Sequence, residues 1–151
     1  MIPALPRATG TDSALTVDAC ILVAAFDGSD RFHREATDFL MEVAQRGVRL
    51  IAPRLLLLEV RCAIARRARD ADAGARADAA LRAAPFLQLV LVDDRLLDAA
   101  GGVGAMLRLR SADALYAACA VLHEAPLVSL DAELVSRANA SLPQRVFNRQ
   151  S

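Results

Sequence analysis

The sequence predicts an α/β fold of three layers, α/β/α, in which a central, mainly parallel sheet of four to five strands is covered by helices on both faces. Short runs that are apolar throughout alternate along the chain with longer segments of helical periodicity. Strands of this kind are typical of a parallel sheet buried on both sides. The length of 151 residues, without a linker or internal repeat, indicates one domain.

The first half of the chain supplies two strands and two or three helices. Leu15–Asp18 is predicted to be a short buried strand that ends on an acid, and Val48–Ala52 a second strand. Between them, apolar residues recur at helical spacing over Asp30–Gln45. Pro53 is suited to the first turn of the next helix, which we expect Asp70–Gly74 to break or bend before an alanine-rich helix continues.

The second half continues the alternation. Its predicted elements are, in order, a strand at Phe86–Val92, helices at Arg95–Leu107 and Ser111–His123, a strand at Pro126–Leu130, a short helix at Ala132–Ala138 and an edge strand at Arg145–Phe147. Residues 1–13 hold two prolines and several small polar residues, so we expect a loose N-terminal leader, with the single domain at residues 14–151.

All 18 basic residues are arginine, which excludes mechanisms that require a lysine. Neither a Walker A phosphate loop nor a Schiff-base enzyme can be built without one. The 18 arginines are balanced by 18 acids, and the pI of about 6.7 argues against non-specific, high-affinity binding of nucleic acid. Local groups of arginine can still contact phosphates.

The three cysteines lie far apart in apolar runs, so we expect free, buried thiols in a reducing cytoplasm. The first residues lack the pattern of a signal peptide, and no apolar stretch is long enough to span a membrane. We therefore expect a cytoplasmic protein without a membrane partner.

Four acids stand in apolar surroundings. Asp18 and Asp131 follow predicted strands, Glu59 lies within the run LLLLEV, and Asp113 is the only charged residue of an apolar helix. Taken singly, these acids have structural explanations: a helix cap or turn for Asp18 and Asp131, an arginine pair for Glu59, and the helix dipole for Asp113.

Taken together, the four acids predict a metal site. In a parallel sheet they can converge at the carboxyl edge of the strands. If the carboxylates lie about 5 Å apart, they repel by about 3 kcal/mol per pair at an effective dielectric of ~20, so such a cluster must protonate or bind a cation. Oxygen ligands without thiolate or imidazole favour Mg²⁺ or Mn²⁺, which can promote phosphodiester cleavage.

The chain resembles the PIN domain nucleases, in particular the VapC-like toxins of bacterial toxin–antitoxin pairs. The resemblance covers about residues 15 to 147 and rests on four short motifs in order: TVDACIL at 16–22, PRLLLLEV at 53–60, LRSADALYAACA at 109–120 and PLVSLD at 126–131. It implies a PIN-like fold and a Mg²⁺-dependent endoribonuclease, with Mn²⁺ as an alternative ion.

The resemblance also implies the roles of individual residues. Asp18, Asp113 and Asp131 hold the metal ion, and Glu59 coordinates it or orients the attacking water. Cys20 stands where the family often has Ser, Thr or Asn, whereas Ser129 keeps a hydroxyl near the last acid. Further implied partners are an RNA substrate, a second copy of the chain in a homodimer, and a small cognate antitoxin that occupies a groove.

Arg108 and Arg110 are the candidate RNA contacts, because they precede a proposed metal ligand. The alternative function is a non-catalytic interaction module of PIN-like fold, in which arginines neutralise the four acids. An Asp-nucleophile phosphatase is disfavoured, because Asp18 lacks a second Asp two residues later and the chain has no lysine.

Overall fold

The computed structural model describes residues 14–141, with side chains through residue 138. At its centre lies a four-stranded sheet in the order β3-β2-β1-β4, in which every neighbouring pair is parallel. The strands are β1 (Ala14–Val17), β2 (Arg49–Pro53), β3 (Leu87–Val90) and β4 (Leu127–Val128). The predicted edge strand at Arg145–Phe147 and the leader at 1–13 lie outside the described residues.

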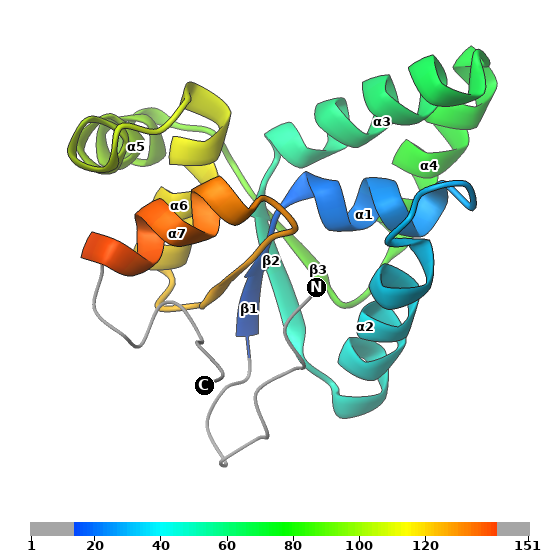
Figure 1. Cartoon of the computed structure of the whole chain (residues 1–151), viewed down its shortest axis with the longest axis horizontal. Helices are drawn as coiled ribbons and strands as arrows, with labels where there is room; N and C mark the ends of the chain where they lie inside the picture. Colours follow the sequence, from blue (N-terminus) through cyan, green and yellow to red (C-terminus); the bar gives the residue numbers. More distant parts are fainter. Residues whose placement is uncertain (1–13, 142–151) are drawn as a thin grey trace.

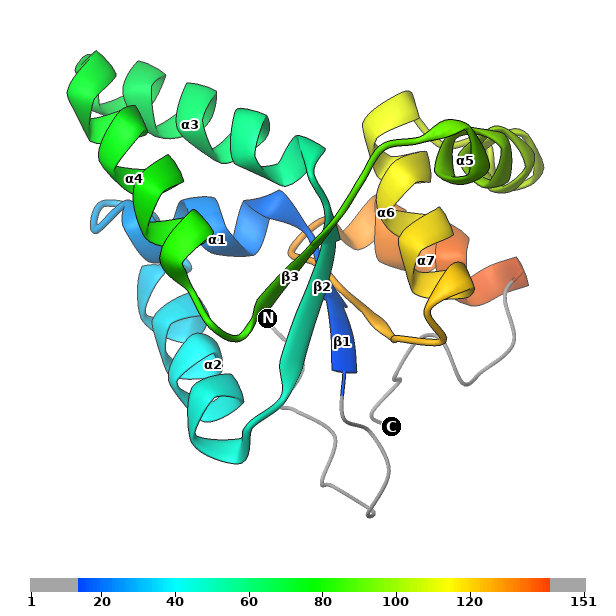
Figure 2. The same ribbon diagram turned by 180° about the vertical axis from the view of Figure 1, so that it is seen from behind.

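Helices cover both faces of the sheet, as Figures 1 and 2 show, so the predicted three-layer architecture is confirmed. One layer contains α1 (Ala19–Phe26), α2 (His33–Arg46), α3 (Leu55–Ala68) and α4 (Ala71–Ala83). The other contains α5 (Asp94–Leu107), α6 (Ser111–Leu122) and α7 (Ala132–Ser141). Each β–α unit returns the chain to the same end of the sheet, which brings the carboxyl ends of the strands together.

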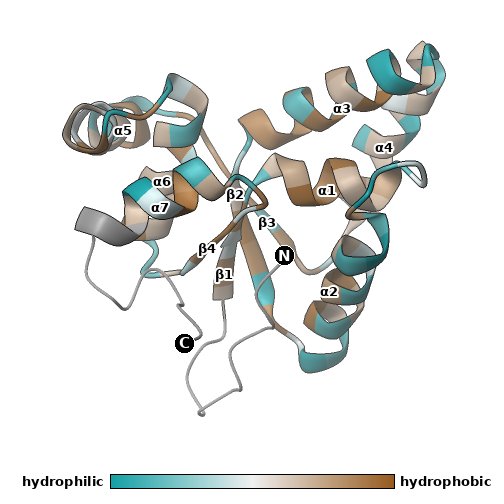
Figure 3. Cartoon of the chain, in the orientation of Figure 1, coloured by the Kyte–Doolittle hydropathy of each residue, from teal (hydrophilic) through white to brown (hydrophobic). Residues whose placement is uncertain are grey.

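The core is built on the strands and on the inner faces of the helices, above all α1 and α6. The strands and α1 are coloured as strongly hydrophobic, whereas polar residues lie on the outward faces of the peripheral helices (Figure 3). Most of α6 is buried between the sheet and α5, which explains why this helix is apolar nearly all round. In the described part of the chain, no helix is both long and apolar enough to cross a bilayer.

The segment after Asp18, for which no element was predicted, forms α1, a helix that is apolar on almost every side. The predicted break before the alanine-rich helix is confirmed: the chain turns at Arg69, in the left-handed region at φ 54°, and Asp70 caps α4, with Gly74 inside that helix. The prediction of buried thiols was wrong for Cys62, which is exposed, whereas Cys119 is buried as expected.

Candidate active site

The carboxyl edge of the sheet places Asp18 beside Ser129. Val17 and Val128 are paired in register, and the backbone N–H of Asp18 donates to the carbonyl of Val128 at 3.0 Å. Asp18 occupies the N-cap position of α1, yet its side chain makes no capping hydrogen bond. Its Oδ2 instead accepts hydrogen bonds from Ser129 Oγ at 2.5 Å and Cys20 Sγ at 3.1 Å. Helix capping therefore does not account for this buried carboxylate.

Cys20 and Ser129 form a small network around that carboxylate oxygen. The backbone N–H of Leu130 donates to Cys20 Sγ at 3.2 Å, and that of Asp131 donates to Ser129 Oγ at 3.0 Å. Burial, followed by the Asp18 carboxylate, raises the pKa of the Cys20 thiol to about 12. Cys20 thus stays protonated and can serve as the donor that a hydroxyl would otherwise supply.

Glu59 projects from the second turn of α3 toward the same edge. Its Oε2 accepts a hydrogen bond of 2.5 Å from the hydroxyl of Tyr116 on α6. Burial raises the pKa of Glu59, the carboxylates of Asp18 and Asp113 raise it further, and the Tyr116 hydrogen bond opposes them. The charge of Glu59 is therefore electrostatically coupled to the charges of Asp18 and Asp113.

Asp113 lies in the first turn of α6, where the helix dipole favours a negative charge. Its pKa is nevertheless raised, first by burial and then by the charges of Asp18 and Asp131, with Arg110 acting in the opposite direction. Asp113 is thus close enough to interact electrostatically with both Asp18 and Asp131.

Asp131 has a clear structural role. Its Oδ1 accepts hydrogen bonds from the backbone N–H groups of Glu133 at 2.9 Å and Leu134 at 3.2 Å, which caps the start of α7. A metal-binding role for Asp131 would be additional to this cap.

The four acids form no ion pair with the arginines of the described residues. Within residues 14–138, none of Asp18, Glu59, Asp113 and Asp131 takes part in a salt bridge. Four carboxylates without an ion-pair partner in these residues, two of which (Glu59 and Asp113) have raised pKa values, have the donor chemistry of a divalent-ion site. In the same residues, however, no three His, Cys, Asp or Glu side chains are gathered closely enough to hold an ion. An ion would have to draw these carboxylates together.

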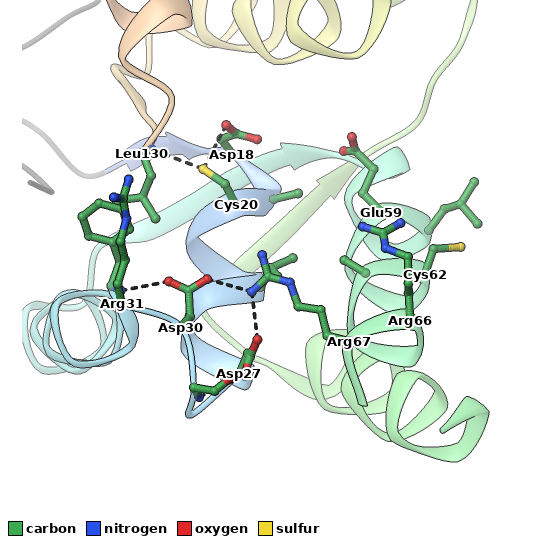
Figure 4. Close-up of a pocket in the computed structure, with 16 residues that line it drawn as sticks. Asp18, Cys20, Asp27, Asp30, Arg31, Glu59, Cys62, Arg66, Arg67 and Leu130 are labelled. Atoms are coloured by element: carbon green, nitrogen blue, oxygen red, sulfur yellow. Dashed lines mark hydrogen bonds and ion pairs between the residues drawn. The ribbon is translucent and has the colours of Figure 1, made fainter. Parts of the chain in front are cut away.

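A groove of about 1140 Å³ opens from the acids and runs between α1 and α3. Figure 4 shows Asp18 and Glu59 at one end, with Arg66 and Arg67 farther along α3. Arg67 Nη1 forms ion pairs with Asp27 at 2.9 Å and Asp30 at 2.7 Å, so it closes the groove at that end.

These contacts hold the pKa of Asp27 at about 2, chiefly through hydrogen bonds from Ser29 and Arg67. Arg31, stacked over Phe32 at 4.5 Å, and Arg66 leave positive charge along the walls of the groove.

A second, smaller cavity of about 70 Å³ lies on the other side of Asp113. Asp113, Asp131, Arg108 and Arg110 all line it. Arg108 ends α5 in the left-handed region and Arg110 precedes α6, so the two predicted arginines are brought beside the acids by the connection between these helices.

The comparisons with known proteins agree with this architecture. The sequence model of the PIN domain matches residues 15–140. The chain belongs to the PIN domain family. Among solved structures, it is similar to a toxin of Mycobacterium tuberculosis, VapC20, described as cleaving the sarcin–ricin loop. The identity is 18% and the TM-score 0.68, over 86% of this chain and 97% of that one. A search of curated proteins found no significant match.

Two features of this PIN domain were missed by the sequence analysis. Arg31, in the loop before α2, was not linked to the site because the sequence placed it in the first turn of the helix predicted over Asp30–Gln45. Tyr116 lies three residues after Asp113, a spacing that puts both on one face of a helix, and this could have indicated its position near the acids.

Proposed function

We propose that this PIN domain is a metal-dependent endoribonuclease and the toxin component of a toxin–antitoxin pair. The observation that carries the proposal is the group of Asp18, Glu59 and Asp113, in which the Asp18 charge raises the pKa of both other acids. None of the three forms an ion pair with an arginine of residues 14–138. Likeness in fold to a toxin that cleaves the sarcin–ricin loop supports RNA as the substrate. In residues 14–138 the four acids form no ion pair with arginine, which disfavours the alternative of a non-catalytic module whose acids are neutralised.

The acids divide into holding and orienting roles. Asp18, Asp113 and Asp131 would hold Mg²⁺ or Mn²⁺, and Glu59 would hold the ion or orient the water that attacks phosphorus. When bound, the ion supplies positive charge to the phosphodiester and favours ionisation of water. Ser129 and Cys20 keep Oδ2 of Asp18 fixed, which leaves its Oδ1 for a further ligand.

The partners follow from the same proposal. RNA would enter along the groove between α1 and α3, where Arg31 and Arg66 provide positive charge. The cognate antitoxin would occupy that groove and block the acids. Leu58, whose side chain is 58% exposed on α3, is a candidate contact for this antitoxin or for the second copy in a homodimer. The cytoplasm is the compartment in which such a pair would act.

The proposal is tested by incubating the purified protein with structured RNAs, one of which contains a sarcin–ricin loop. We expect cleavage with Mg²⁺ or Mn²⁺ and none after addition of EDTA. A metal ion at about 100 times its Kd should stabilise the native protein by about 2.7 kcal/mol, so thermal melting provides a second measurement.

Asp113→Asn is the variant that links the two measurements, because it removes one proposed ligand at the start of α6. It should neither cleave RNA nor melt at a higher temperature with metal. Equal melting of both proteins with metal would refute the site, and EDTA-resistant cleavage would refute its metal dependence.

Arg108 and Arg110 are predicted to contact RNA phosphates on the Asp113 side of the site. Replacing both by alanine should raise KM about tenfold and reduce the salt dependence of binding by about two ion equivalents. Binding of a non-cleaved RNA, measured by fluorescence anisotropy at several salt concentrations, checks this. Arg76→Ala/Arg82→Ala is the matched control, because it also removes two arginines, which pair with Asp70 and Asp78 at α4. An equal loss in the control would mean that net charge alone matters.

A further inference from the structure

Tyr116 is a buried residue of α6 whose polar end reaches the acid cluster. Its side chain is only 1% exposed, and it packs in the core cluster formed mainly by β1, α1, α2 and α3, whereas its neighbours Ala114 and Leu115 pack against α5. The hydroxyl of Tyr116 therefore passes from one helical layer toward the other at the edge of the sheet. There it meets Glu59 of α3 at 2.5 Å.

The direction of this hydrogen bond is fixed by the surroundings. Burial and the nearby Glu59 carboxylate raise the pKa of the Tyr116 phenol above its ordinary value. The hydroxyl therefore keeps its proton and is the donor of the hydrogen bond. A neutral donor holds a carboxylate in place without cancelling its negative charge, which an arginine in the same position would do. Oε2 of Glu59 is engaged in this way, and Oε1 accepts no hydrogen bond from the described residues.

Glu59 needs such a partner because its environment would otherwise displace it. Glu59 is a long side chain on a half-exposed face of α3, and the charges of Asp18 and Asp113 repel it. Arg66 lies about two turns farther along the same groove and would attract a free carboxylate. Loss of the Tyr116 hydroxyl would therefore leave Glu59 free to rotate away from the other acids.

We infer that Tyr116 is a positioning residue: its hydroxyl holds the Glu59 carboxylate beside Asp18 and Asp113, against their repulsion, while leaving its charge intact. The hydrogen bond is independent of any activity. Its consequence for cleavage depends on the proposed nuclease function. The two parts are therefore tested separately.

The first test uses the metal-free protein and no RNA. The sequence contains one tyrosine and no tryptophan, so the intrinsic fluorescence comes from Tyr116. A carboxylate that accepts a hydrogen bond quenches an excited phenol. Glu59→Gln should therefore raise the fluorescence severalfold, whereas Asp113→Asn, which removes a nearby charge but not the bond, should change it little. Equal fluorescence of the wild type and Glu59→Gln would overturn the inference.

The second test is a double-mutant cycle on RNA cleavage. Tyr116→Phe should lower kcat about tenfold with little change in KM, and in the Glu59→Gln background the same substitution should change kcat less than about twofold. Additive effects in the cycle would overturn the inference, because Tyr116 would then act independently of Glu59.

Thr16→Val is the control for a general loss of packing or stability. The Thr16 hydroxyl is buried and donates to the carbonyl of Ala125 at 2.9 Å, so this variant also loses one buried hydroxyl bond. Its kcat should stay within about twofold of wild type. A loss equal to that of Tyr116→Phe would assign the effect to stability and overturn the positioning role. If the wild type cleaves no RNA, the proposed function fails, and the fluorescence test still decides whether Tyr116 holds Glu59.

Discussion

Replacing Asp18 by asparagine is expected to lower RNA cleavage about a thousandfold, or by ~4 kcal/mol of transition-state stabilisation. Asparagine keeps the size of the side chain and can still accept a hydrogen bond from Ser129, but it lacks the charge that would hold a divalent ion. The measurement is single-turnover cleavage at saturating metal. Because the shape of the buried site is preserved, the loss should come with normal folding.

The same variant should be more stable than the wild type when no metal is present. Asp18 is 8% exposed and forms no salt bridge with the residues that the structure describes, and its charge raises the pKa of both Glu59 and Asp113. Removing that charge relieves the repulsion by about 1–2 kcal/mol near neutral pH, which corresponds to a rise in Tm of about 2–8 °C. Opposite effects on activity and stability are characteristic of a functional acid cluster.

The pH dependence of this stabilisation has a definite sign. Glu59 and Asp113 have folded-state pKa values above the ordinary 4.5 and 3.8, so the stability they contribute is complete below pH 3.8 and is lost as pH rises through the folded values. The gain in stability of Asp18→Asn over the wild type should therefore be absent at low pH. It should grow as the pH rises from 3.8 through the folded-state pKa values of Glu59 and Asp113.

Thermal melts of EDTA-treated protein between about pH 3.5 and pH 7 measure the effect. Asp98→Asn, the same chemical change at an exposed position of α5, serves as the control and should melt like the wild type throughout. A lower Tm for Asp18→Asn at neutral pH would mean that the Ser129 and Cys20 hydrogen bonds outweigh the repulsion.

The architecture could be predicted from the sequence because a parallel sheet that is buried on both faces requires strands that are apolar at every position, and such runs are visible in a single sequence. Runs such as Val48–Ala52 are apolar throughout, and helices such as α2 carry an amphipathic period. The rule that the carboxyl ends of parallel strands meet at one edge also placed Asp18 and Asp131 on the same edge of the sheet, where the structure has Asp18 bonded to Ser129.

What the sequence could not predict depends on contacts between distant segments. α1 has no polar face, so no periodicity distinguished it from an extension of the first strand. The short bond between Tyr116 and Glu59 joins residues 57 positions apart and depends on how two helical layers approach the sheet edge. The capping role of Asp131, in contrast, was a local alternative visible from its place before a helix.

Gly74→Ala is expected to destabilise the protein by about 2 kcal/mol, although alanine is the better helix former by ~1 kcal/mol. Gly74 lies in α4 where that helix crosses α3. A Cβ at this position would lie 2.5 Å from the carbonyl oxygen of Arg61 and 2.9 Å from Cβ of Ala65. A backbone carbonyl cannot rotate away as a flexible side chain can, so α3 and α4 must move apart. The expected fall in Tm is about 4–8 °C.

Gly101→Ala provides the matched control, because this substitution also places an alanine in a helix but meets no atom within 4 Å. It should stabilise the protein by up to about 1 kcal/mol, so thermal unfolding of the two variants should shift in opposite directions. Since Arg61 and Ala65 belong to the helix that carries Glu59, Gly74→Ala should also lower cleavage. Equal stabilisation by both substitutions would show that α3 and α4 are packed less closely than the structure indicates.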